Sequence, residues 1–187
     1  GITNDGVTGS IRLTGSRTFG SNLNFVFTKS DGVNQSKTGS SFGTEITSVN
    51  NVTFSNPLGS RLSGSLTVNG ALNVAVGHLN TDASKMTIAN GGSVTLGAGV
   101  WVVGQLEKFA STGSSTLNYE VGPDTITYTP VSLNLNSVSS AGNISVRATK
   151  ALQPNMASSI LSNTKRLNSY YSIGGNASLD SYSANIS

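Results

Sequence analysis

The sequence has few charged residues, few aromatic residues and no cysteine. Only 10% of its 187 residues are Asp, Glu, Lys or Arg, and only 6% are aromatic. The absence of cysteine excludes disulfide bonds and every metal or catalytic site that needs a thiolate. The 11 basic residues are dispersed along the chain and form no dense stripe, which argues against a nucleic-acid partner. No apolar run is long enough to insert into a membrane as a helix.

Small polar residues dominate what is present. Gly, Ser, Thr and Asn together make up about half of the chain, an unusually strong bias. These residues favour turns and pleated surfaces and weaken long helices. Regularly spaced Val, Ile, Leu and Phe, with a net charge of only +3, predict a chain that buries strand faces and is ordered. The first residue is Gly1 and not Met, so we expect a mature or excised fragment.

Alternation of apolar and polar residues with a period of two predicts an all-β fold. In the first part of the chain the alternating runs are short and separated by Gly and Asn; they cover residues 10–14, 24–28, 45–49, 51–55, 65–74, 85–89 and 93–97. This spacing favours stacked rungs of a β-solenoid or β-helix over residues 1–110, with Asn, Ser and Thr laddering at corners. The alternative is a β-sandwich built from short strands.

The pattern changes near residue 100. A dense apolar strand over residues 100–109 carries the single Trp, and longer alternating strands follow at residues 117–121, 131–135 and 143–148. These fuller strands predict an antiparallel β-sandwich over residues 111–187. Residues 156–167 are the one candidate helix, and their Ser-rich composition favours a short turn or loop instead.

No set of residues for catalysis can be assembled from the sequence. His78 is the only histidine, and the spacing to Asp82 on a β scaffold does not enforce contact between them. The eight carboxylates are scattered singly, whereas glycoside hydrolysis needs two that face each other and calcium loops need several close together. We therefore expect no enzyme activity, no cofactor and no metal site.

Several motifs resemble a module of very large secreted surface proteins of the Bacteroidetes. Its "V-x-G-x-L-x-K" strand is similar to residues 102–108, and its following strand and "Y-x-P-V-x-L" are similar to residues 119–123 and 128–133. Residues 153–158 and 165–171 resemble two further motifs, although Gln153, Ser169 and Tyr171 replace the usual His, Arg and Trp. Residues 9–19 resemble the repeats that precede the module.

The resemblance implies an extracellular protein, exported by type IX secretion and held at the cell surface. It also implies that the sandwich continues for several strands, so that residues 111–187 are a truncated sandwich or one completed by another chain. An incomplete sandwich has an unpaired strand edge and an open apolar groove, which can accept a strand from a neighbour. The expected partners are therefore copies of this chain or neighbouring domains of the same surface protein.

Two kinds of site remain as expectations. Asp124-Thr125-Ile126 resembles the Bacteroidetes O-glycosylation motif, so Thr125 is a predicted glycan acceptor in a predicted turn. Tyr170, Tyr171 and Tyr182 are candidate glycan-contact aromatics, although the tyrosines and Trp101 are expected mostly to fill the core or the seam between the two parts. The sequence thus predicts a structural or adhesive segment of a surface protein or filament. The alternatives are a module that binds surface polysaccharide and a β-helix domain that acts on polysaccharide.

Overall fold

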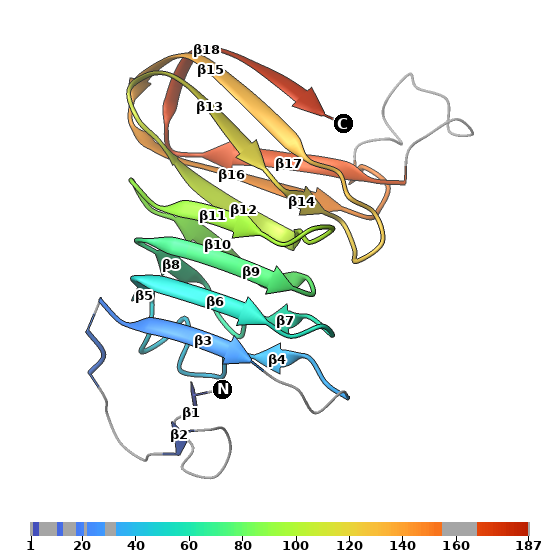
Figure 1. Cartoon of the computed structure of the whole chain (residues 1–187). Coiled ribbons are helices and arrows are strands. Elements are labelled where there is room, and N and C mark those ends of the chain that lie inside the picture. Colours follow the sequence, from blue (N-terminus) through green and yellow to red (C-terminus); the bar gives the residue numbers. More distant parts are fainter. Residues whose placement is uncertain are drawn as a thin grey trace.

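The computed structural model describes residues 2–3, 11–12, 18–20, 22–28, 33–154 and 168–186, and it confirms the predicted all-β fold (Figure 1). The region predicted as a short turn, residues 156–167, lies outside the described residues. The strands in chain order are β1 (Ile2–Thr3), β2 (Ile11–Arg12), β3 (Asn24–Thr28), β4 (Ser36–Lys37), β5 (Ser48–Val49), β6 (Asn51–Ser55), β7 (Ser60–Arg61), β8 (Leu66–Val68), β9 (Ala71–Val76), β10 (Leu79–Ile88), β11 (Ser93–Leu96), β12 (Val102–Ala110), β13 (Gly113–Tyr119), β14 (Val121–Gly122), β15 (Val131–Ser140), β16 (Gly142–Thr149), β17 (Tyr170–Gly175) and β18 (Ser178–Ile186).

The first part of the chain is a parallel β-solenoid of about four coils. One wall is the parallel sheet β11-β9-β6-β3, and the opposite wall contains β4, β5, β7, β8, β10 and β12 (Figure 1). Along the first wall Phe25 pairs with Val52, Val52 with Leu72, and Leu72 with Val94. Successive coils therefore advance by 27, 20 and 22 residues, which explains why no strict repeat is visible in the sequence.

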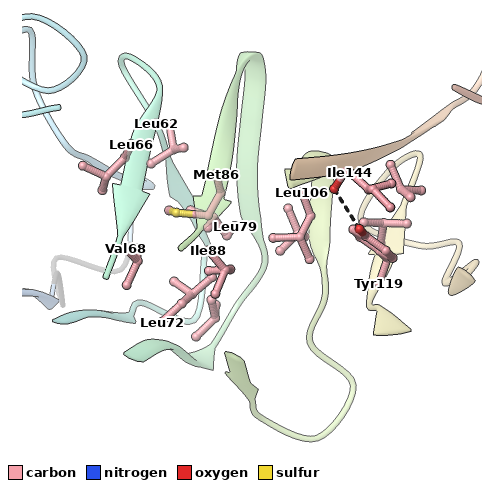
Figure 2. Close-up of a cluster of buried hydrophobic side chains, with 14 of the residues drawn as sticks. Leu62, Leu66, Val68, Leu72, Leu79, Met86, Ile88, Leu106, Tyr119 and Ile144 are labelled. Carbon is pink, nitrogen blue, oxygen red and sulfur yellow. Dashed lines mark hydrogen bonds between the residues drawn. The ribbon is translucent and has the colours of Figure 1, made fainter. Parts of the chain in front are cut away.

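Inward-facing residues of the coils stack into apolar columns. Val52 and Phe54 on β6 and Leu72 and Val74 on β9 are buried. Thr53 and Asn73, which alternate with them, are polar and less buried. Figure 2 shows Leu72 from the first wall and Ile88 from the second wall, which both belong to this core. Each coil buries little apolar area alone, so stacking on its neighbours provides most of the hydrophobic stabilisation.

One corner of the solenoid lies within a run that the sequence predicts as a single strand. The run 65–74 was expected to be one strand, but it divides into β8 and β9 at Asn69-Gly70. A Cβ at Gly70 would lie 2.4 Å from Asn51 Oδ1 and 2.9 Å from the Asn50 carbonyl oxygen, so this corner has no room for a side chain. Asn51 Oδ1 accepts the Ala71 N–H at 2.7 Å, and Asn24 Oδ1 accepts the Asn51 N–H at 3.1 Å. This asparagine ladder satisfies backbone groups that a corner leaves unpaired.

The solenoid passes into an antiparallel structure within β12. One edge of β12 pairs in parallel with β10 as far as Lys108. On the other edge Val102 and Val103 pair in parallel with β14, whereas residues 105–110 pair antiparallel with β16, which in turn pairs with β17. A second antiparallel sheet, β13-β15-β18, forms the other layer of the predicted sandwich. One hydrophobic core runs through both parts. In that core the Tyr119 hydroxyl donates a hydrogen bond to the Ile144 carbonyl (Figure 2).

Candidate functional site

The sandwich is open along one side, between β17 and β18. On β18, Tyr182 lies opposite Leu135 in the register, on the face of the sheet where Leu135 is buried. On β17, Ile173 likewise lies opposite the buried Val146. Both residues therefore point to the inner side of the sandwich, yet Tyr182 is 62% exposed and Ile173 is 47% exposed. Inner-facing apolar groups of both layers thus remain in contact with water.

The C-terminal end of β18 continues this open apolar side. Ile186 lies opposite the fully buried Val131 and is itself 51% exposed. Burial decreases from β15, whose inner residues are fully covered, to β18, whose inner residues are not. We call Ile173, Tyr182 and Ile186 the open apolar side of the sandwich. Large apolar side chains that stay exposed on neighbouring strands make this side a candidate interaction surface.

β17 and β18 are also the edge strands of their sheets. Among the described residues, β17 is paired only with β16, and β18 only with β15. Natural edge strands usually carry charges, Pro or bulges that discourage pairing with another chain. The nine residues of β18 contain one charge, Asp180, and β17 contains none. The register of β18 with β15 is irregular between Leu135 and Ser140, so the regular edge of β18 is its C-terminal half. The Asp180 carboxylate accepts hydrogen bonds from the Ser137 and Ser139 hydroxyls on β15, and these bonds lower its pKa.

The structure separates the three candidate glycan-contact tyrosines. Tyr170 and Tyr171 are consecutive on β17, so they face opposite sides of the sheet. Tyr171 packs against the hydrophobic core, and its hydroxyl lies 3.4 Å from the Thr129 carbonyl, to which it donates. Tyr182 is on the other layer, on the open apolar side. These residues do not share one exposed platform.

Thr125 is exposed in the loop that follows β14, as the sequence predicts. The preceding Asp124 organises this loop, because its Oδ1 accepts the backbone N–H groups of Ile126 and Thr127 at 3.0 and 2.7 Å. The Lys150 ammonium contacts the other carboxylate oxygen at 2.5 Å. The hydrogen bond from Lys150, followed by those from the two backbone groups, holds the pKa of Asp124 well below its usual range. Thr125 is therefore presented to solvent on a fixed loop.

His78, Asp82, Glu107 and Glu120 are engaged in structural contacts. The His78 ring lies 4.1 Å from the Trp101 ring, and its Nδ1 accepts the Trp101 N–H at 3.4 Å. Asp82 pairs with Arg61 at 2.7 Å and not with His78. Lys85 and Lys108 form ion pairs with Glu107 and Glu120. No group of three or more His, Cys, Asp or Glu side chains able to hold a metal ion occurs among the described residues.

The sequence did not predict β17 and β18 as strands, although they form the open side. The available signal was the alternation of Tyr182, Ala184 and Ile186 with polar residues, which the high Ser content of β18 obscures. No protein-family model, no curated protein and no solved structure matches the chain. The resemblance to Bacteroidetes surface proteins therefore stays a prediction. Within the part of the chain that the structure covers, no helix is long and apolar enough to cross a membrane.

Proposed function

We propose that this chain is a structural segment of a bacterial surface protein or filament, and that its open sandwich accepts a β-strand from a second copy. The observation that carries the proposal is the exposure of inner-facing apolar residues on two edge strands whose outer edges pair with no other strand in the described part of the chain. Apolar side chains that stay exposed to water do not contribute the hydrophobic stabilisation that the buried core residues contribute. A strand that covers these side chains would bury them and add that stabilisation.

The solenoid supplies the structural part of the proposal. Its second wall forms one hydrogen-bonded sheet, in the order β4-β7-β10-β12-β16-β17, which runs from the first coil into the sandwich. A stack of coils joined by a continuous sheet is a rigid, elongated spacer, because each coil is fixed by its neighbours. Figure 1 shows that this stack places the first coil and the sandwich at opposite ends. Such a segment suits a stalk or filament better than a compact binding domain.

The chemistry of the opening determines what fills it. The backbone groups on the free edges of β17 and β18 require a partner with its own unpaired backbone, which is an extended strand. Ile173 and Tyr182 face the opening from the two layers, so this strand must place apolar side chains on one face. β18 of a second copy has these properties, because Tyr182, Ala184 and Ile186 alternate with Ser183 and Asn185. The net charge of +3 opposes self-association only weakly.

A position outside the cell belongs to the same proposal. It is supported by the absence of cysteine and by the resemblance to type IX secretion substrates. The same resemblance makes Thr125 a proposed O-glycosylation site, and its exposure on a fixed loop supports that assignment. The intact mass of protein purified from its native source tests it. We expect a mass above that of the polypeptide, lost in Thr125→Ala; an unmodified mass would contradict it.

Sedimentation velocity over a range of concentrations tests self-association, with electron microscopy of the most concentrated samples. We expect dimers or larger assemblies that grow with concentration. Tyr182→Glu places a charge on the open apolar side and should shift the chain to a monomer. Ile126→Glu is the matched control, because Ile126 is also exposed but lies on the loop after β14, so it should assemble like the wild type.

A folded chain that stays monomeric at every concentration would contradict the strand-acceptor proposal. Equal loss of assembly in Tyr182→Glu and Ile126→Glu would also count against it, because general surface charge would then explain the effect. Far-UV circular dichroism and the thermal midpoint of each variant establish that it is folded. These measurements separate loss of the interface from loss of the fold.

A further inference from the structure

A rigidly held tyrosine stands at the seam between the solenoid and the sandwich. Half of the Tyr128 side chain is exposed (49%), and its ring lies 5.4 Å from the Trp101 ring at an angle of 32°. Trp101 is itself fixed, because its indole N–H donates to the Asp124 carbonyl at 2.8 Å and its other neighbour is the His78 ring. Tyr128 is therefore an exposed ring that loses little conformational entropy when a ligand packs on it.

Tyr128 also lines a shallow groove of about 260 Å³. The groove lies between the end of β13, the loop that leads into the start of β15, and the end of β18. Its lining includes Asn118, Glu120, Pro130, Ser132 and Asn185. Carboxylate, amide and hydroxyl groups thus surround one aromatic ring. Ligand sites commonly combine an aromatic surface with a few polar groups that fix orientation.

The polar groups of the groove are held in place. The Lys108 ammonium donates to Glu120 Oε2 at 3.2 Å and also to the Asn118 carbonyl. The Ser132 hydroxyl donates to Asn118 Oδ1 at 2.9 Å. The Tyr128 hydroxyl is protonated at neutral pH and can donate a hydrogen bond. Burial, and then the charge of Glu120, raise its pKa further. The groove therefore offers both donors and acceptors at fixed positions.

This combination matches the surface of a sugar ring. A pyranose has an apolar C–H face that packs on an aromatic ring, and hydroxyl groups at its rim that both donate and accept hydrogen bonds. In the ion pair of Glu120 with Lys108 the carboxylate is the more exposed partner, 31% against 15% of the side chain, so the charge that reaches the groove is negative and repels anionic sugars. The electrostatics of the groove thus favour neutral sugars over uronic acids or phosphorylated sugars.

We propose that the groove bounded by Tyr128, Glu120, Asn118 and Asn185 binds a neutral hexose unit of a polysaccharide. This site shares β18 with the open apolar side but lies on the other face of that strand, because Asn185 is in register with Ser132 whereas Ile186 is in register with the buried Val131. It does not require the self-association proposed above. It also differs from the sequence prediction, which placed the candidate contacts on Tyr170, Tyr171 and Tyr182. Tyr171 has a positioning role here, since its hydroxyl holds the backbone at Thr129, next to Tyr128.

Titration with oligosaccharides tests the site. The probes are hexamers of β-1,4-linked glucose, of mannose and of galactose, with oligogalacturonate as the anionic counterpart. We expect saturable binding of at least one neutral series, with chemical-shift changes at the amides of Asn118, Ser132 and Asn185, and much weaker binding of oligogalacturonate. Trp101, the only tryptophan, gives a second readout through its fluorescence because its ring contacts Tyr128.

Two variants assign the binding to the groove. Tyr128→Ala removes the stacking ring and should weaken binding about tenfold, the effect of about 1.4 kcal/mol. Glu120→Gln keeps the shape and should weaken it too, which provides a test if Tyr128→Ala fails to fold. Val26→Ala is the control, because Val26 is exposed on β3 and does not line the groove, so its loss should leave the affinity unchanged.

Three results would overturn the proposal. The first is no binding of any neutral series by the folded chain. The second is equal affinity in the wild type and in both groove variants. The third is a set of chemical-shift changes that maps to another surface. None of these results affects the sedimentation experiment, so failure of the groove and failure of the strand acceptor are distinguishable.

Discussion

The Tyr119 hydroxyl donates a hydrogen bond of 2.7 Å to the backbone carbonyl of Ile144, in the buried seam where β13 meets β16. Tyr119 is fully buried, so its hydroxyl has no alternative partner in water. This contact links the two layers of the sandwich at the point where the solenoid ends (Figure 2). A buried polar group without its partner is costly, and this makes the bond a direct probe of the seam.

Replacing Tyr119 by Phe should lower the free energy of unfolding by about 1–3 kcal/mol, because the Ile144 carbonyl loses its buried donor. Chemical denaturation measures the change. Tyr182→Phe is the matched control: Tyr182 is exposed, so its variant should stay within about 0.5 kcal/mol of the wild type. Equal effects of the two substitutions would show that the seam is not packed as described.

The same tyrosine predicts the behaviour at high pH. Burial, with a smaller contribution from the charge of Glu107, raises the pKa of Tyr119 well above its usual value. Above a pH of about 10 the unfolded chain releases this proton while the folded chain keeps it, so the free energy of unfolding falls as pH rises. Tyr119→Phe should show a shallower fall in denaturation curves measured from pH 8 to 11. An unchanged slope would mean that Tyr119 is accessible to solvent.

Leu72 tests the inward columns of the solenoid. Leu72 is fully buried between Val52 and Val94 in the register, so Leu72→Ala should cost about 2–5 kcal/mol through lost burial and a cavity. Val26→Ala is the control, because Val26 lies on the outer face of β3 and should change stability by less than about 0.5 kcal/mol. Thermal and chemical unfolding give both values. Comparable losses would contradict the assignment of the two faces.

Gly70 tests the coil corner. A methyl group at this position would lie 2.4 Å from Asn51 Oδ1 and 2.9 Å from the Asn50 carbonyl, so Gly70→Ala must displace the asparagine ladder. We expect a loss of about 1–3 kcal/mol. Gly174→Ala on β17 is the matched control, since no atom lies within 4 Å of the added Cβ. A stable Gly70→Ala protein would show that the corner has room that the structure does not have.

Much of the solenoid could be predicted, because its strands alternate apolar with polar residues and are separated by Gly and Asn. Residues 24–28 and 51–55 alternate strictly, and they form β3 and β6 with the predicted bounds. The corner at Asn69-Gly70 was missed, because alternation continues across it and only the close approach of Asn51 reveals the turn. Long-range proximity of this kind is not encoded in a local pattern.

The open side of the sandwich was harder to locate from the sequence. The family resemblance predicts an open edge but does not say which residues form it. Tyr182 and Ile186 lie in a Ser-rich segment in which the apolar alternation is weak, so the pattern did not reveal them. Adjacent tyrosines were treated as one candidate platform, whereas the period of the strand sends Tyr170 and Tyr171 to opposite faces. The groove at Tyr128 depends on residues from three separate segments, which only the folded chain brings together.

Hydrogen–deuterium exchange at two protein concentrations tests the central claim most directly. If a second copy donates a strand to the open sandwich, the amides of β17 and β18 exchange more slowly at high concentration, while those of β9 are unchanged. Tyr182→Glu should abolish this difference. Exchange in β17 and β18 that does not depend on concentration would contradict a strand donated by a second copy.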